Sequence, residues 1–568
     1  MCYNDKATSL LATGNYQLTT KRGSSDINIF KKILAYVLTA AVLLPLTACQ
    51  SDDGFDRVFG YDISANPVTL DPQQANDANS NLIIGNLYMG LLTVNRDGSI
   101  GTGAASDYTV SEDGLKYHFT LRQDVYWVNV EGYEKQCTAK DFVYGFTRLF
   151  LPETNAPHAA DYYCIENARD INMGWTAYTS RLGVKALGDF ELEITLSYPN
   201  PRFPAMLAEP PAMPCDEEFF LNARGKYGLS AECTPSNGSF YVRSWNYDPY
   251  ASTDVNRVLL SRNRKNAEAW EICPAGLNFY IEKKDDFVPD FLHGDTACIA
   301  LSNDEKSLIK GNYGCEEFCS VTCGLVFNRK FELFKNEDFL KALSLLANRE
   351  EISAAISEFE KAEGIVPKQV TMSENNYRET AGSCAIPDRS AEKARELFLQ
   401  ARSELNTDLF TGARVIVCSA AANTAVSYIM QEWQREFGFY CVVETLSEND
   451  FKKRLQSGDF ELAVTELSGK YNSPAAYLEQ FCTGNSENYI GFSDPEFDEL
   501  IKLAAEASDL KTSAEYFKQA EQRLIDSSAF LPLYYKNEYF FTGKKNVDII
   551  YNPFSKTVNF TQAKVKKR

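Results

Sequence analysis

Strand-like and helix-like segments alternate along the whole chain, with no internal repeat and no low-complexity linker between them. Residues 117–122 and 191–196 alternate apolar and polar side chains with period two, and turn residues bound both segments. Helical periodicity appears at 138–146, where Thr138 is the expected N-cap, and again at 494–504 and 514–524. This alternation predicts an α/β architecture in which the chain forms one interwoven body.

Composition supports a folded, non-nucleic-acid-binding protein. Of the 568 residues, 44% are apolar and 24% are charged, which is the range of globular proteins. The 77 Asp+Glu outnumber the 57 Lys+Arg, giving a formal net charge of −20. Because phosphate binding depends on clustered Lys and Arg, nucleic acid is excluded as a partner.

A short apolar segment near the N-terminus predicts export. Lys31 and Lys32 precede the apolar residues 33–46, a stretch too short to span a membrane as a stable helix. A basic flank, an apolar run and small residues before a cleavage point are typical of a signal peptide. An ordinary signal peptide or a buried apolar helix would also fit this pattern.

The end of this segment, Leu46-Thr47-Ala48-Cys49, resembles the lipobox of bacterial lipoproteins. The resemblance implies that residues 1–48 are removed and that Cys49 carries lipid as the new N-terminus, with 49–54 as a tether. Residues 1–48 hold five Lys/Arg and two Asp, so 52 basic and 75 acidic residues remain and the net charge becomes −23.

Thirteen cysteines lie beyond Cys49, and an odd number cannot all form disulfides. No Cys-x-x-Cys motif occurs. Cys315, Cys319 and Cys323 form a C-x3-C-x3-C run, but residues 320–327 read as a buried strand, in which Cys is a small apolar side chain. This pattern favours a buried strand over a metal cluster. We also hypothesise that the cysteines beyond Cys49 are scattered free thiols.

Motifs for covalent chemistry are missing from the sequence. It contains no Walker-type phosphate loop, no G-x-S-x-G and no H-E-x-x-H. Of its three His residues, His118 falls on a period-two strand, His293 is expected in a loop before Gly294, and His158 is isolated. We therefore predict a binding protein with no catalytic residue, metal or cofactor.

Motifs along residues 60 to 540 then carry a family resemblance. The chain resembles the extracytoplasmic solute-binding proteins of peptide ABC importers, the oligopeptide/dipeptide-binding family. The matching segments occur in family order: Leu70-Asp71-Pro72, Leu87-Tyr88-Met89-Gly90-Leu91-Leu92, the strand 111–122, Val125-Tyr126-Trp127, 138–144, 182–187, 236–240, 327–329, 342–349, 497–500 and 520–535.

This resemblance implies a two-lobed periplasmic-binding-protein-like fold with a hinge. Lobe I would comprise 55–270 plus 536–568, with an extra subdomain at about 89–184, and lobe II would comprise 271–535. The lobes would close on a ligand, and a permease would recognise the closed form.

The resemblance also implies the ligand-gripping strand, which matches residues 460–468 and offers Thr465, Glu466, Leu467 and Ser468 to an added peptide strand. The family follows this strand with D-Y-x-x-P, whose Asp pairs with the peptide ammonium. Here the motif reads Lys470-Tyr471-Asn472-Ser473-Pro474, so that anchor is in doubt. Glu466 could replace it, the ligand could present an anion, or Lys470 could point to solvent.

Further candidate ligand-binding residues match cleft positions of the family. Asn76 and Ala78 follow the Leu-Asp-Pro turn, and His158 stands where the family usually has a cleft Tyr. His158 as an ordinary surface-loop residue is the alternative.

The resulting prediction is a monomeric, lipid-anchored receptor on the extracytoplasmic face of the cell membrane. It would capture a peptide or peptide-like solute and deliver it to the permease subunits of an ABC importer. The alternatives are the same fold retuned to a non-peptide solute or a peptide signal, and an extracytoplasmic hydrolase or redox protein.

Overall fold

The polypeptide builds several sheets, of which the largest has seven strands and uses segments distant in the sequence. A computed structural model describes residues 57–566 except 96–98, 201, 252–254, 267–270, 282–285, 373–374, 406–410 and 508. These residues belong to the unit Gly54–Arg568. The predicted signal segment, Cys49 and the tether lie outside the described residues.

The N-terminal half forms two four-stranded sheets. The first has the order β1 (Val58–Ile63), β12 (Gly276–Ile281), β11 (Arg257–Arg262) and β10 (Phe240–Asn246), with β1 parallel to β12. The second is antiparallel, in the order β4 (Ala105–Val110), β5 (Lys116–Leu121), β9 (Glu191–Thr195) and β8 (Val184–Ala186). Strands β5 and β9 confirm the two period-two segments of the sequence.

The rest of this part of the fold consists of helices and short hairpins. The helices are α2 (Ala78–Leu87), α3 (Ala139–Phe150), α4 (Ala168–Asn172), α5 (Phe203–Met206), α6 (Glu217–Asn222) and α7 (Val288–His293). The hairpins are β2–β3 (Leu92–Val94, Ile100–Thr102), β6–β7 (Tyr126–Val128, Glu134–Gln136) and β23–β24 (Ile550–Asn552, Thr557–Asn559), and β22 (Asn546–Val547) pairs with β25 (Lys564–Val565).

Two local expectations have different outcomes. Thr138 caps α3 as predicted, and its backbone N–H donates to the Asp141 carboxylate at 2.6 Å. The expectation of a loop at His293 is wrong, because His293 ends α7 and Gly294 closes the helix in the left-handed conformation, with φ of 89°.

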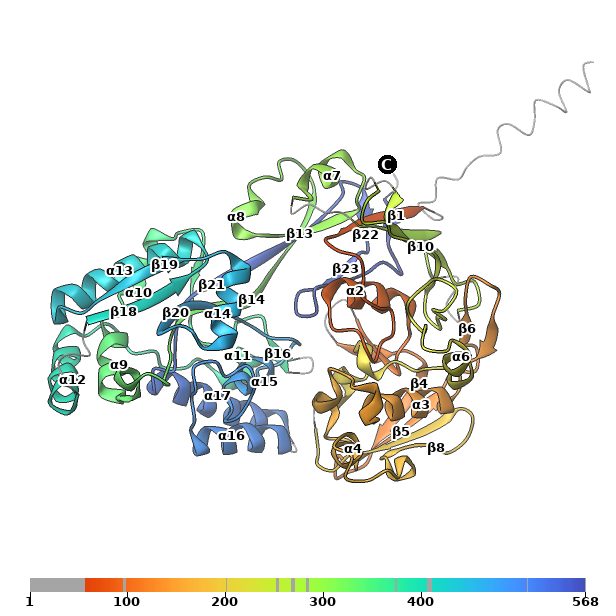
Figure 1. Ribbon diagram of the computed structural model, residues 1–568, viewed down its shortest axis with the longest axis horizontal. Coiled ribbons are helices and arrows are strands. Elements are labelled where there is room, and N and C mark those ends of the chain that lie inside the picture. The colour runs from red at the N-terminus through yellow and green to blue at the C-terminus, as the bar shows by residue number, and fades with distance from the viewer. Residues whose placement is uncertain are drawn as a thin grey trace, which may run out of the picture. The chain divides into compact units, whose positions relative to one another are not determined.

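The seven-stranded sheet has the order β13 (Cys298–Ser302), β21 (Phe530–Thr542), β14 (Gly314–Phe327), β20 (Leu462–Ser468), β18 (Thr411–Val417) and β19 (Tyr440–Thr445), and β15 (Glu360–Lys361) also pairs with β21. In Figure 1 the green β13 and β14 flank the blue β21, so distant segments lie side by side. The cysteine run lies in β14, where Cys319 and Cys323 are buried, as the strand prediction required.

Successive residues of a strand point to opposite faces of this sheet, and they pack in two different apolar clusters. Val415 and Val417 belong to one cluster, which includes residues of α9 (Glu337–Leu345), α10 (Arg349–Ala355), α12 (Ala391–Glu404) and α13 (Ala420–Phe437). Ile416 belongs to the other, with residues of α11 (Tyr377–Ala381), α14 (Glu448–Ser457), α15 (Ala475–Leu478), α16 (Pro495–Glu506) and α17 (Leu510–Asp526). This period-two division makes a helix–sheet–helix sandwich.

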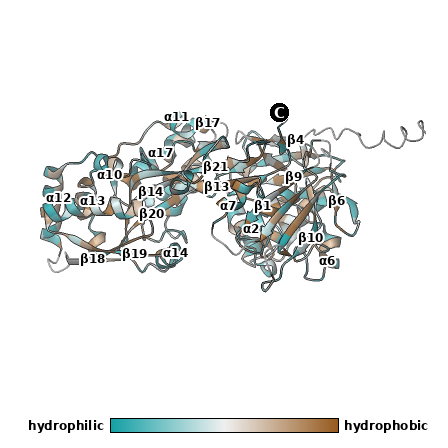
Figure 2. Cartoon of the chain, turned by 90° about the horizontal axis from the view of Figure 1, so that it is seen from above, coloured by the Kyte–Doolittle hydropathy of each residue, from teal (hydrophilic) through white to brown (hydrophobic). Residues whose placement is uncertain are grey.

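In Figure 2, teal marks the hydrophilic residues that predominate in α12. Only three residues of α12 are buried, Ala394, Phe398 and Ala401, which share one face of the helix. The remaining elements are short: α8 (Asn303–Lys306), and β16 (Thr371–Met372) paired with β17 (Asn375–Asn376).

A separate apolar cluster, here called the first core, runs from Phe59 to Cys298 and from Phe540 to Ala563. Strand β21 reaches both regions, because Phe540 packs in the first core whereas Leu533 packs in the sandwich. Strand β14 does the same through Phe318 and Leu325. These two long strands therefore connect the two regions of apolar packing.

Candidate functional site

Strand β20 has an unpaired edge along most of its length. On one side β14 pairs with it over all seven residues, from Leu462 to Ser468. On the other side β18 pairs with it only at Leu462 and Ala463. Among the described residues, no strand pairs with that edge from Val464 to Ser468, although the Ser468 carbonyl accepts a bond from Gln480 Nε2 at 2.9 Å. Such an edge can accept an extended chain through its backbone groups.

Four of the predicted ligand-binding residues lie on this edge segment and differ in exposure. Leu467 is buried and contributes to the sandwich, Thr465 is half-buried, and Glu466 and Ser468 are exposed. The Glu466 carboxylate forms an ion pair with Lys536 of β21, with 2.8 Å between Oε1 and Nζ. This ion pair spans β14, since Lys536 lies on the strand beyond it in the sheet.

Lys470 lies just beyond the strand, and its side chain is 67% exposed. Its ammonium is 2.8 Å from Glu487 Oε1. The sequence marked Lys470 as the residue that departs from the family motif, but it gave no sign of Glu487 as its partner.

Tyr471, the next residue, makes two polar contacts. Its hydroxyl donates to Glu479 Oε2 at 3.0 Å, and the guanidinium of Arg202 lies over its ring. Arg202 precedes α5 and pairs with Glu209 at 3.3 Å. Burial raises the pKa of Glu479, and the positive charge of Arg202 opposes that increase.

Asn76 and Ala78 lie at the start of α2 and are exposed. The turn that precedes them is held by a buried ion pair. The Asp71 carboxylate of this turn binds the Arg148 guanidinium of α3 through both oxygens, at 3.1 and 2.5 Å. Both side chains of this pair are almost fully buried. The buried pair therefore fixes the segment that presents Asn76 and Ala78.

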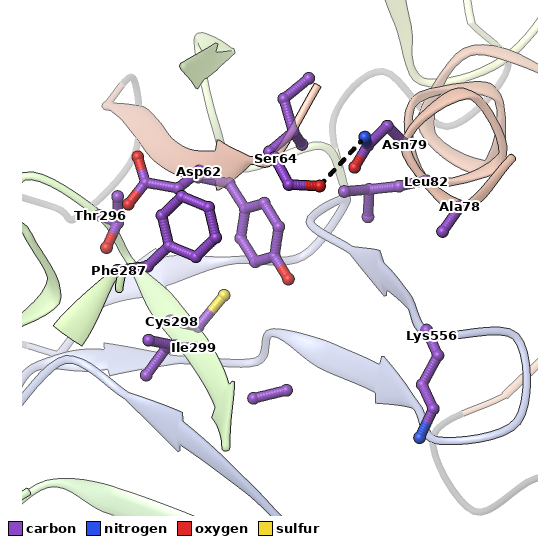
Figure 3. A pocket seen from close by; sticks show the side chains of 13 residues that line it. Asp62, Ser64, Ala78, Asn79, Leu82, Phe287, Thr296, Cys298, Ile299 and Lys556 are labelled. Atoms are coloured by element: carbon purple, nitrogen blue, oxygen red, sulfur yellow. Dashed lines mark hydrogen bonds between the residues drawn. The ribbon is translucent and has the colours of Figure 1, made fainter. Parts of the chain in front are cut away.

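A cavity of about 250 Å³ opens beside the start of α2 (Figure 3). Three separate parts of the chain line it: the end of β1 with α2, the segment around β13, and the β23–β24 hairpin. The lining residues are Tyr61, Asp62, Ile63, Ser64, Ala78, Asn79, Leu82, Phe287, Thr296, Cys298, Ile299, Ala300 and Lys556.

The cavity combines an apolar lining with a few polar groups. Leu82, Phe287 and Ile299 contribute apolar surface, while Asn79 Nδ2 lies 3.5 Å from Ser64 Oγ (Figure 3). The Lys556 ammonium is 2.6 Å from Glu538 Oε2. A mixed lining of this kind suits a small organic group or a peptide side chain.

Ala78 is the one predicted residue that lines this cavity. The sequence did not reveal Tyr61, Cys298 or Lys556, because they come from segments more than 200 residues apart and no motif links them. His158 lies elsewhere, and its Nδ1 is 3.0 Å from Asp161 Oδ2.

The described part of the chain contains no group of three or more His, Cys, Asp or Glu side chains arranged to hold a metal ion. Within the same residues, no helix is both long and apolar enough to cross a membrane.

Comparison with known proteins assigns the family. The model of the bacterial extracellular solute-binding proteins, family 5, matches residues 100–258 and 319–489, which is more than half of the chain. The chain belongs to this family of extracellular solute-binding proteins.

Similar proteins support the same assignment. The dipeptide-binding protein of Lactococcus lactis is 27% identical over 517 residues, covering 86% of this chain and 90% of the relative. A probable deoxycholate-binding periplasmic protein of Escherichia coli is 24% identical over 500 residues, with 84% and 88% covered.

The solved substrate-binding domain of an oligopeptide ABC transporter from Bacillus anthracis has a TM-score of 0.69 at 24% identity. The match covers 90% of this chain and 99% of that structure. The likeness confirms the predicted two-lobed α/β fold class.

Proposed function

We propose that the protein captures a peptide or peptide-like solute between two lobes and delivers it to an ABC importer, without covalent chemistry. The open edge of β20 from Val464 to Ser468 is the observation that carries this proposal. A peptide can add to that edge as a further strand, because backbone hydrogen bonds give affinity that depends little on side-chain identity.

The proposed lobes keep the predicted two-lobe division, but lobe I extends to about Cys298, because β12 belongs to the first four-stranded sheet and the first core runs from Phe59 to Cys298. Lobe II would then follow as far as about 535, and 536–568 would return to lobe I. Strands β14 and β21 support a hinge there, since each packs in both apolar regions. The cavity beside Ala78 and Asn79 would receive part of the ligand in lobe I. Closure on the ligand would give the permease a form to recognise.

The proposal includes a lipid anchor at Cys49 with 50–54 as its tether, on the extracytoplasmic face of the membrane. Membership of an extracellular solute-binding family supports export. A single receptor monomer, with neither cofactor nor metal, completes the proposed assembly with the permease.

N-methylated peptides test strand addition without altering the protein. In an added strand only alternate amides face β20, so methylating one alternate set removes the bonds to the edge and methylating the other set does not. We expect calorimetry with a binding pentapeptide to show at least a tenfold loss for one set and a change of less than about threefold for the other. Equal effects of the two sets would contradict strand addition.

A non-peptide solute is the second candidate, favoured by a relative named as a probable deoxycholate-binding protein. The apolar side chains of Leu82, Phe287 and Ile299 in the cavity are compatible with such a ligand. Native mass spectrometry of the protein purified from its host separates the two, since a peptide and a steroid-like acid differ in fragmentation.

A further inference from the structure

A side-chain contact joins the two regions of apolar packing at a place outside strands β14 and β21. The guanidinium of Arg202 lies over the ring of Tyr471. Arg202 directly precedes α5, whose Phe203 and Met206 pack in the first core. Tyr471 follows β20 and packs against the apolar cluster that contains Ile416. The contact therefore connects two parts of the chain that have separate cores.

The same guanidinium interacts with one carboxylate from each region. Glu209 is 3.3 Å from Arg202 Nη2 and precedes a short helix whose Ala212 packs in the first core. Glu479 follows α15 and accepts the hydroxyl of Tyr471 at 3.0 Å. Burial raises the pKa of both carboxyls, and the charge of Arg202 opposes the increase in each case. The positive charge of Arg202 thus attracts an acid from both regions.

We propose that Arg202 and Tyr471 form a latch, a contact that is made when the two lobes close and is broken when they open. The proposal rests on the proposed function and adds two positioning residues to it. Arg202 belongs to the proposed lobe I and Tyr471 to the proposed lobe II, and neither lies on β14 or β21. Rotation of the lobes about these two strands would therefore separate the guanidinium from the ring.

The latch sets the ligand affinity because it stabilises one conformation only. A contact that exists in the closed form alone shifts the equilibrium toward that form. The apparent Kd of a ligand that needs the closed form then increases in proportion as the closed fraction falls. The Arg202 side chain is only 22% exposed, so its stacking on the ring of Tyr471 is worth a factor of about 3 to 30.

Arg202→Gln tests the latch, with Arg181→Gln as the matched control. Arg181 also lies over a tyrosine ring, that of Tyr178 at 5.2 Å, but this pair lies within one short segment of the chain. Calorimetry would use a pentapeptide selected from a random pool for binding to the wild type. We expect Arg202→Gln to raise its Kd about 3- to 30-fold and to increase the radius of gyration of the ligand-free protein in small-angle X-ray scattering. Arg181→Gln should change neither quantity.

Tyr471→Leu removes the other half of the latch and supplies an independent variant. It should produce the same opening, and the double variant should open no further than the more affected single variant, because both substitutions break one contact. Wild-type scattering and Kd in Arg202→Gln, or fully additive effects in the double variant, would overturn the latch while leaving peptide binding intact. If the wild type bound no peptide, the proposed function would fail, whereas scattering of the ligand-free variants would still decide whether the latch exists.

Discussion

The Asp71–Arg148 pair shows how a single buried contact supports the candidate site. Arg148 reaches from α3 to the turn that precedes α2 and also donates to Gln73 Oε1 at 2.7 Å. Its guanidinium stacks on the Phe220 ring at 3.9 Å. Both charges are out of water, so each depends on the other.

Asp71→Asn is therefore expected to lower the free energy of unfolding by about 3–5 kcal/mol, because it leaves Arg148 buried without a counter-charge. Urea denaturation measures the change. The control is Asp189→Asn, whose exposed pair with Lys140 should be worth about 0–1 kcal/mol. Similar losses in the two variants would refute the role of the buried pair.

The buried carboxyl group of Asp141 makes the stability of the folded protein depend on pH. Burial raises the pKa of this carboxyl to about 6, above its value in an unfolded chain. The folded state therefore holds the proton more tightly, and stability falls as the pH rises from about 4 to about 6.

Comparing wild type with Asp141→Asn by urea denaturation at several pH values isolates this contribution. The wild-type stability should fall relative to the variant by up to about 3 kcal/mol between pH 4 and pH 7. A difference that is constant with pH, or that grows in the opposite direction, would contradict the raised pKa.

For single residues, the sequence predicts contacts between residues that are close together along the chain. The Thr138 cap was predictable because its partner Asp141 lies three positions away. The partners of Asp71 and Lys470, 77 and 17 positions away, were not, since which side chains meet depends on the packing of separate elements.

Among the elements, β14 and β21 are the longest strands and connect the two apolar regions. Gly324 of β14 has no space for a side chain: an added Cβ would lie 2.8 Å from the Leu531 carbonyl oxygen and would overlap the Phe530 ring. Gly85 in α2 is exposed, and an added Cβ there meets nothing within 4 Å.

Gly324→Ala should therefore destabilise the protein by about 1–3 kcal/mol through overpacking. Gly85→Ala should stabilise it by about 0.5–1 kcal/mol, because alanine loses less backbone entropy in a helix. Thermal unfolding of both variants provides the check, and a loss in both, or in neither, would contradict this description of the two elements.

The family resemblance predicted strand β20, but its open edge was not predictable. The edge exists because β18 pairs with only Leu462 and Ala463, and strand pairing between segments almost 50 residues apart leaves no signature in either one. The family resemblance indicated the strand's role, whereas the partners of Glu466 and Lys470 required the structure.

For the whole molecule, the thirteen cysteines beyond Cys49 are all free thiols. Nine are buried and Cys315 is the exposed one. Burial raises the pKa of Cys441 to about 12, which makes this thiol unreactive in the folded protein.

Alkylation followed by peptide mapping should find Cys315 modified first in the native protein and all thirteen modified after unfolding. The unfolding step uses no reductant, so that any disulfide stays closed. Two or more of the thirteen that resist alkylation until reductant is added would show disulfides and contradict the free-thiol description.

The central claim is that a peptide adds to the open edge of β20, and hydrogen–deuterium exchange tests it most directly. The protein would be measured alone and with a pool of random pentapeptides. Binding should slow hydrogen exchange at the amides of Val464–Ser468 more than at the amides of β19. Strand β19 serves as the internal reference because it lies at the end of the same sheet. Peptide binding that leaves the exchange of Val464–Ser468 unchanged would contradict the claim.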